Sequence, residues 1–212
     1  MIELNKILRM IRSKVKDNNE ITYSDYDILD AVNECIRYLN NSFALQQSDF
    51  LEKVQHYRQD DMNAAIDAYN AALPEGGQRK EHIDFTVTGA DLPPDFISLV
   101  HVMRARDGYY LSPVPAIEHV DGGTYKVFAN KIYCNTDFDL LYRASIAQVK
   151  DMDTDTIELP VTFFDPIIKV TCMILSNNAS GDVLMQEVTR IIQNIVPKRR
   201  YSHVKCRMPF MV

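Results

Sequence analysis

Aspartates in the segment 151–155 alternate with other residues, as they do at the start of an EF-hand calcium loop. Such a loop also requires glycine at its sixth position and glutamate at its twelfth. The sequence has Thr156 and Thr162 at these two positions. We therefore predict a solvated turn at Asp151, Asp153 and Asp155, and no bound metal.

Three other pairs of aspartates resemble the carboxylates that converge on two cations in metal-dependent nucleases. They are Asp25 with Asp27, Asp60 with Asp61, and Asp137 with Asp139. Acids at helix starts and turns also have ordinary capping and solvation roles. The sequence contains neither a phosphate-binding G-x-x-x-x-G-K-[ST] loop nor a G-x-S-x-G nucleophile elbow. We predict that the protein is not an enzyme and binds no cofactor.

The cysteines and histidines are widely spaced and form no pattern typical of a zinc site or a disulfide framework. We predict reduced thiols, two of them in helical cores, and histidines that are either hydrogen-bonded in the fold or exposed. These residues are Cys35, Cys134, Cys172, Cys206, His56, His82, His101, His119 and His203.

The charge of the chain is distributed unevenly. The net charge is −6, but no acid follows Pro197, and the first 196 residues carry 18 basic and 29 acidic side chains. A basic segment that ends in apolar residues favours docking on a partner, although a solvated tail or a nonspecific contact with DNA remains open. The predicted partner-binding residues are Lys198, Arg199, Arg200, Tyr201, Lys205, Arg207 and Phe210.

Hydrophobic periodicity predicts an α+β chain, mostly a bundle of about four or five helices with an inserted small antiparallel β-sheet. We expect a single domain over 1–196 and an extended C-terminal tail over 197–212. The β insertion is expected at about 82–160, beginning with a strand at 82–88, and prolines mark the borders of most of it. No apolar run is long enough to cross a membrane. The helices are expected at 2–17, 24–44, 49–73, 162–176 and 180–196.

With these elements in place, the sequence resembles the head-to-tail connector proteins, or tail adaptors, of tailed bacteriophages. The likeness lies in the order and spacing of elements and covers most of the chain. The stretch that opens the second helix is Ile28-Leu29-Asp30-Ala31-Val32-Asn33-Glu34, and the proline-containing stretch that leads into the sheet is Leu92-Pro93-Pro94-Asp95-Phe96-Ile97. The sheet contributes Tyr125, Ile132 and Tyr142, and the stretch before the last helices is Ile157-Glu158-Leu159-Pro160.

The resemblance implies a ring of identical subunits, typically twelve, in the neck of the virion between the capsid portal and the tail. Its partners would be the portal protein, tail or neck proteins and further copies of itself, with genome DNA passing through. The protein would be made in the cytoplasm of a bacterial host. The segment 46–80 is longer and the C-terminal tail shorter than the family leads us to expect. A neck stopper or second ring protein, or a small DNA-binding or packaging accessory protein, are the alternatives.

Overall fold

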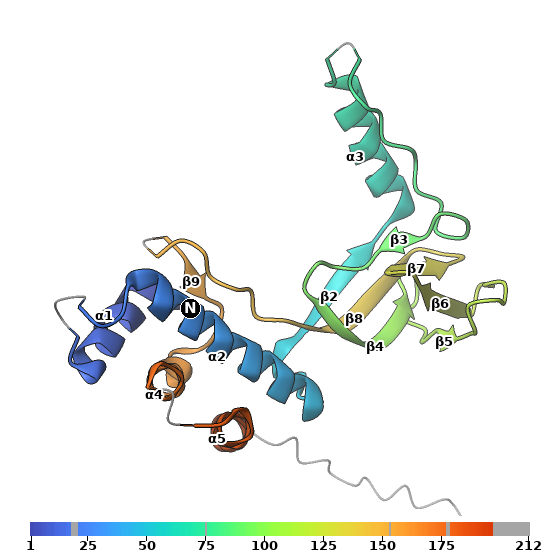
Figure 1. Cartoon of the computed structure of the whole chain (residues 1–212). Coiled ribbons are helices and arrows are strands. Elements are labelled where there is room, and N and C mark those ends of the chain that lie inside the picture. Colours follow the sequence, from blue (N-terminus) through green and yellow to red (C-terminus); the bar gives the residue numbers. More distant parts are fainter. Residues whose placement is uncertain (18–20, 75, 153, 177–178, 197–212) are drawn as a thin grey trace, which may run out of the picture. The chain divides into compact units, whose positions relative to one another are not determined.

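The computed structural model describes residues 1–17, 21–74, 76–152, 154–176 and 179–196. The chain divides into two compact units (Figure 1). The first contains Met1–Ser42 and the described residues from Val149 onward, and the second is Phe43–Gln148. The second unit is therefore inserted in the sequence of the first.

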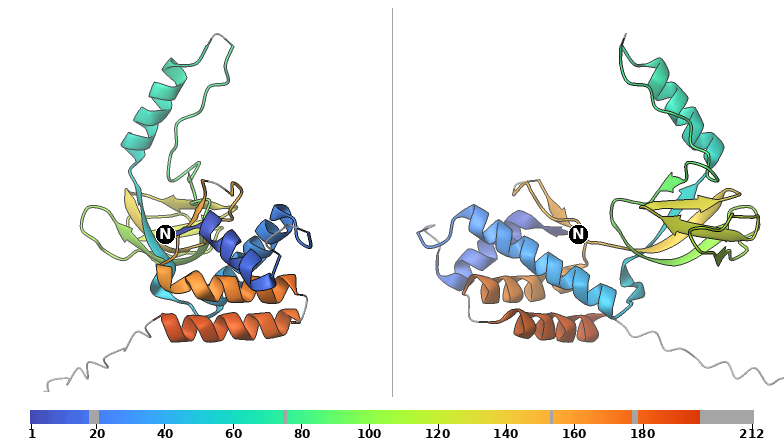
Figure 2. Two further views of the ribbon diagram at one scale, coloured as in Figure 1. Left: turned by 90° about the vertical axis from the view of Figure 1, so that its left-hand side faces the viewer. Right: turned by 45° about the vertical axis from the view of Figure 1, so that its right-hand side comes forward.

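The first unit is built from helices contributed by both ends of the chain. Helix α1 packs on α4, which packs in turn on α5, and α4 and α5 lie side by side in Figure 2. A short two-stranded sheet joins β1 to β9. The elements are β1 (Ile2–Glu3), α1 (Leu4–Val15), α2 (Asp25–Leu45), β9 (Thr156–Ile157), the 3₁₀ turn η2 (Val161–Phe163), α4 (Phe164–Leu175) and α5 (Gly181–Ile195).

The apolar stripes of these helices are buried in the core of the first unit. In α1, Leu4, Ile7 and Ile11 are fully buried, since their 3-4 spacing places them on one helix face. Helix α2 begins after Ser24, whose side chain accepts a hydrogen bond from the backbone N–H of Asp27. The Asp27 carboxylate accepts from the Ser24 N–H in return, so the pair caps the helix reciprocally.

The second unit contains two sheets and one helix. One sheet has the antiparallel order β2-β8-β4, and the other has the order β3-β7-β6-β5, with β5 parallel to β6. The elements are η1 (Asp49–Leu51), β2 (Glu52–Tyr57), α3 (Gln59–Ala71), β3 (Ala90–Asp91), β4 (Phe96–Arg104), β5 (Ser112–Pro113), β6 (Thr124–Phe128), β7 (Lys131–Cys134) and β8 (Phe138–Ala144).

Strand β8 is the centre of the three-stranded sheet and fixes its register. Alternate β8 residues are buried, and the others face cross-strand partners on β2. Arg143 lies opposite Glu52, with 3.6 Å between its guanidinium and the carboxylate. Asp139 lies opposite His56, with 2.8 Å between the carboxylate and Nδ1. A slip of one residue would separate both pairs.

The predicted fold class is wrong. The described residues form five helices and three sheets of two, three and four strands, and not a helical bundle with one small sheet. The expected helix over 49–73 contains strand β2, because all six β2 residues pair with β8. The expected strand over 82–88 is instead a turn, because the carboxylate of Asp84 accepts hydrogen bonds from the backbone N–H groups of Thr86 and Val87.

Candidate functional site: the projecting arm

Helix α3 projects away from the sheets of the second unit, and residues 76–89 return alongside it (Figures 1 and 2). We call α3 together with this return segment the arm. No residue of α3 is buried. Met62 packs against the core of the second unit from a partly buried position, and polar contacts with the return segment supplement this packing along the helix.

A stripe of polar side chains on α3 binds the backbone of the return segment. Asn63 Oδ1 accepts from the N–H of Ile83 at 2.7 Å, and its Nδ2 donates to the same residue's carbonyl at 3.0 Å. Asn70 makes the same two bonds with Lys80, both at 2.8 Å. Gln59 extends the stripe by accepting from a backbone N–H at the base of the arm. Each amide replaces the partner that a neighbouring β-strand would supply.

Charged and aromatic contacts supplement these amides. His82 Nε2 lies 2.7 Å from the carboxylate of Asp67 on α3. The Lys80 ammonium lies 4.3 Å from the centre of the Tyr69 ring, a cation–π distance. Apolar periodicity does not predict this arrangement. Its signal is the polar series Gln59, Asn63, Asp67 and Asn70, which recurs at the spacing of one helix face.

The base of the arm is anchored to the start of β8. Arg58 donates to the carboxylate of Asp139 at 2.8 Å and to the carbonyl of Phe138 at 3.0 Å. Burial alone would raise the pKa of Asp139, but hydrogen bonds from His56 and Arg58 outweigh it and keep that pKa below its ordinary value. The N–H of Gln59, the first residue of α3, donates to Asp137 at 2.9 Å.

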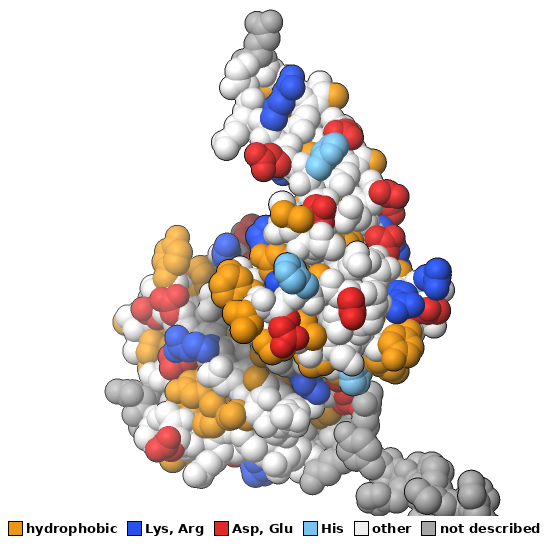
Figure 3. Space-filling view, turned by 90° about the vertical axis from the view of Figure 1, so that its right-hand side faces the viewer, with side chains coloured by type: hydrophobic (Ala, Val, Ile, Leu, Met, Phe, Trp, Pro, Cys, Tyr) orange, Lys and Arg blue, Asp and Glu red, His pale blue; other side chains and the backbone are white. Residues whose placement is uncertain are grey.

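Two recesses lie beside the arm. The larger, a groove of about 790 Å³, is lined by α3 residues, by the return segment from Gln78 to Ile83, and by Asp91 and Lys131 of the four-stranded sheet. The smaller, of about 350 Å³, lies at the base of the arm, where Asp60, Asp84 and Asp137 contribute three carboxylates. Figure 3 shows both acidic and basic side chains on the arm.

Of the aspartates singled out in the sequence, those at the start of α2 and Asp155 have structural partners of their own, whereas Asp60 and Asp137 line the smaller recess together. Asp27 caps α2, and Asp25 forms an ion pair with Arg12. In the segment 151–155, Asp155 accepts from the backbone N–H groups of residues 150 and 151, while Asp153 lies outside the described residues. Within the part of the chain that the structure describes, no three acidic, histidine or cysteine side chains are placed to bind a metal ion together.

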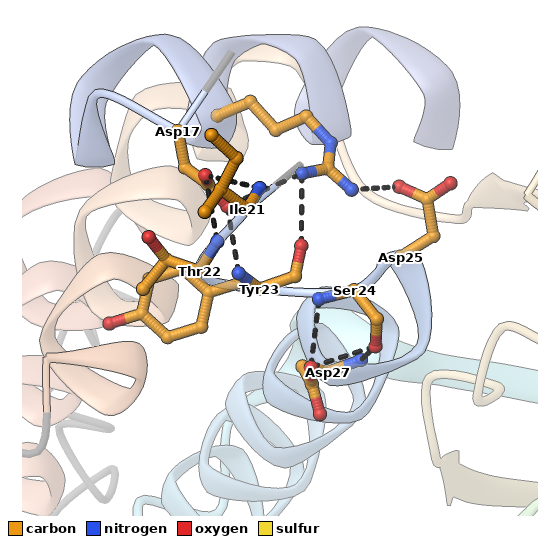
Figure 4. A network of polar contacts seen from close by, with 8 residues as sticks. Asp17, Ile21, Thr22, Tyr23, Ser24, Asp25 and Asp27 are labelled. Carbon is orange, nitrogen blue, oxygen red and sulfur yellow. Dashed lines mark hydrogen bonds and ion pairs between the residues drawn. The ribbon is translucent and has the colours of Figure 1, made fainter. Parts of the chain in front are cut away.

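Figure 4 shows the polar network that joins α1 to the start of α2. The carboxylate of Asp17 accepts hydrogen bonds from three backbone N–H groups, those of Ile21, Thr22 and Tyr23, at 2.8–3.0 Å. The bonds from Thr22 and Tyr23 contribute most to lowering the pKa of Asp17. Arg12, itself nearly buried, lies 3.6 Å from this carboxylate and donates to the Tyr23 carbonyl. We interpret this network as structural, because it holds the end of α1 to the start of α2.

Three of the four cysteines lie within the described residues. Cys35, Cys134 and Cys172 are free thiols, and burial raises the pKa of Cys35 to about 12, far from that of a reactive thiolate. Cys206, His203 and the predicted partner-binding residues lie outside the described residues. Their roles stay predictions. The partner-binding residues are Lys198, Arg199, Arg200, Tyr201, Lys205, Arg207 and Phe210.

No protein-family model matches the chain, and no curated protein matches it. None of the helices among the described residues has the length and apolar character needed to cross a bilayer.

Proposed function

We propose that this protein is a structural component of the neck of a tailed bacteriophage, where copies form a ring that joins the capsid portal to the tail. The observation that carries the proposal is the order of the elements. Helices from the two ends of the chain pack together, and the β-rich unit is inserted between them. This order is the basis of the resemblance to head-to-tail connectors.

The residues that carry the resemblance fall at structurally defined positions, which supports the proposal. The stretch 28–34 lies in the first turns of α2, with Ile28 and Val32 fully buried. The stretch 92–97 leads into β4, and Tyr125, Ile132 and Tyr142 are buried on three strands of the second unit. Residues 157–160 connect β9 to the α4–α5 pair.

The charge distribution also suits a protein that borders a DNA channel. The first 196 residues carry more acids than bases, so a passing polyanion is repelled more than it is bound. The basic segment after Pro197 would then contact a protein partner, the portal or a neighbouring subunit. The basic residues of this segment equally favour the alternative of a DNA-binding accessory protein, for which they would contact phosphates.

Electron microscopy of the purified protein, alone and mixed with portal rings from the same source, tests the proposal. We expect a ring stacked on the portal. Particles that never associate with the portal would contradict the adaptor role and favour a deeper neck layer. Salt-dependent DNA binding that disappears when the residues after Pro197 are removed would instead favour the accessory role.

A further inference from the structure

The groove beside the arm has basic side chains that the fold itself does not pair with acids. Arg79 makes neither a hydrogen bond nor an ion pair within the described residues. Lys80 contacts only the face of the Tyr69 ring through its ammonium group. Lys131 is already 3.5 Å from the carboxylate of Asp91. Among the charged residues that line the groove, Arg79, Lys80 and Lys131 outnumber Glu81 and Asp91 by one, which leaves a small excess of positive charge.

The base of the same arm has the opposite charge. Asp60 and Asp61 lie in the first turn of α3, and the adjoining recess adds Asp84 and Asp137 with no lysine or arginine in its lining. Hydrogen bonds from the hydroxyl and then the N–H of Thr86 hold the pKa of Asp84 below its ordinary value. We call these four aspartates the acidic patch.

The groove and the acidic patch adjoin along the return segment, at Ile83 and Asp84, but Arg79 and Asp60 are too far apart to pair within one molecule. Asp60 lies in the first turn of α3, whereas the return segment near Arg79 is bound at Asn70, ten residues further along the helix. At a rise of 1.5 Å per residue, this stretch of helix measures about 15 Å. Such a separation exceeds both ion-pair contact and the screening length of about 10 Å in ordinary buffers.

We propose that the basic groove of one copy receives the acidic patch of the next copy, in a head-to-tail contact between neighbouring subunits. The proposal rests on the ring-forming function proposed above and assigns residues to its subunit contact. Charge complementarity identifies a second copy as the partner. A contact between two different patches repeats from copy to copy and closes into a ring when the rotation permits.

Nucleic acid fits the groove less well than an acidic protein surface does. Glu81 and Asp91 lie in its lining and would repel the continuous row of phosphates on a strand. A local group of carboxylates can pair with Arg79 and Lys80 while leaving these acids in solvent. The excess of acids over the first 196 residues opposes the approach of a polyanion as well.

Charge reversal on each side of the contact tests the proposal in the full chain. We expect Arg79→Glu and Asp60→Arg each to weaken self-association about tenfold or more, as measured by sedimentation velocity at low ionic strength. An equimolar mixture of the two variants should recover assembly. In a ring where the two variants alternate, each contact joins either an unchanged groove to an unchanged patch or a reversed groove to a reversed patch, so opposite charges always meet. The variant that carries both substitutions should assemble alone, because each of its contacts joins a reversed groove to a reversed patch.

Two exposed positions provide matched controls. Arg9 is exposed on α1 of the first unit, and Glu118 is exposed on a loop of the four-stranded sheet. Arg9→Glu and Glu118→Arg make the same changes in charge at residues that belong to neither the groove nor the acidic patch, so we expect both to assemble as the wild type does. Circular dichroism and thermal melting check that each variant is folded.

Wild-type assembly by both single variants would overturn the contact, and so would failure of the mixture to recover it. A wild-type assembly that stops at two copies would overturn the head-to-tail arrangement. Binding of a single-stranded oligonucleotide that is lost in Arg79→Glu would assign the groove to nucleic acid instead. If rings of the wild type and of both variants stack on the portal, the proposed subunit contact is wrong and the proposed function stands. If the wild type forms no ring with or without the portal, the proposed function fails.

Discussion

Asn70 binds the backbone of Lys80 through both ends of its side-chain amide, accepting from the N–H and donating to the carbonyl at 2.8 Å each. Ten residues separate the two in the sequence. Together with the equivalent bonds at Asn63, these two bonds fix the return segment to the helix at two points along its length.

Asn70→Ala should release the outer part of the return segment. A hydrogen bond of this kind contributes roughly 0.5–1.5 kcal/mol, so the exchange of the Lys80 amide should accelerate on the order of tenfold. Hydrogen exchange read by mass spectrometry or NMR measures the change. Global thermal stability should hardly alter, since alanine also favours the helix.

The matched control is Asn41→Ala, at an exposed asparagine of α2. We expect it to leave exchange in the return segment as in the wild type. Equal protection of Lys80 in Asn70→Ala and the wild type would show that other contacts hold the segment.

Glu187 on α5 forms an ion pair with Lys169 on α4 and another with Arg190 on its own helix, each at 2.7 Å, so the first pair links the two helices. Hydrogen bonds from Arg190 and then Lys169 lower the pKa of Glu187 from 4.5 to about 2. A carboxylate with a lowered folded-state pKa stabilises the fold above its unfolded-state pKa and loses this effect as the pH falls. The first unit should therefore lose stability as the pH falls from about 4.5 to about 2.

Chemical denaturation at several pH values across this window measures the effect. Glu187→Gln should show a smaller loss, because it removes the titrating group. Arg190→Gln should reduce the loss in part, because it removes the largest cause of the shift. An identical pH dependence in Glu187→Gln and the wild type would mean that the pair is not coupled to folding.

A substitution in the core of the first unit should have a larger effect on stability than the loss of a surface ion pair. Ile168 on α4 is fully buried, so a carboxylate placed there would lose its hydration. Ile168→Asp should prevent folding, and Ile168→Ala should cost about 2–5 kcal/mol. Val161→Asp, at a residue 71% exposed, is the control and should melt near the wild type. A wild-type melting temperature for Ile168→Asp would show that the site is not buried.

The helices of the first unit could be predicted because their signal is local. Leu4, Ile7 and Ile11 recur on one face within a few residues, and a window of that length contains everything needed to recognise the pattern. The same holds for the cap formed by Ser24 and Asp27, three residues apart.

Strand β2 could not be predicted in this way because its partners are distant in sequence. Its segment has neither a clear helical nor a clear strand period, and what decides its structure is pairing with β8, more than 80 residues later. The turn at Asp84 is local, but the alternation of Ile83, Phe85 and Val87 predicts a strand at the same residues. The Asx turn, in which the Asp84 carboxylate accepts from the Thr86 N–H, is therefore not evident from the pattern. The polar stripe of α3 has a helical period, but polar residues at this spacing are also typical of an ordinary solvated helix face.

The segment after Pro197 provides the most direct test of the portal contact. Basic residues followed by apolar ones suit a segment that becomes ordered on a partner surface. Deletion of residues 201–212 should therefore abolish docking on portal rings, seen by electron microscopy, and leave circular dichroism and thermal melting unchanged. Replacement of Lys198, Arg199 and Arg200 by glutamine in the full-length chain separates charge from length. If the truncated protein still decorates portals, the contact lies elsewhere on the molecule.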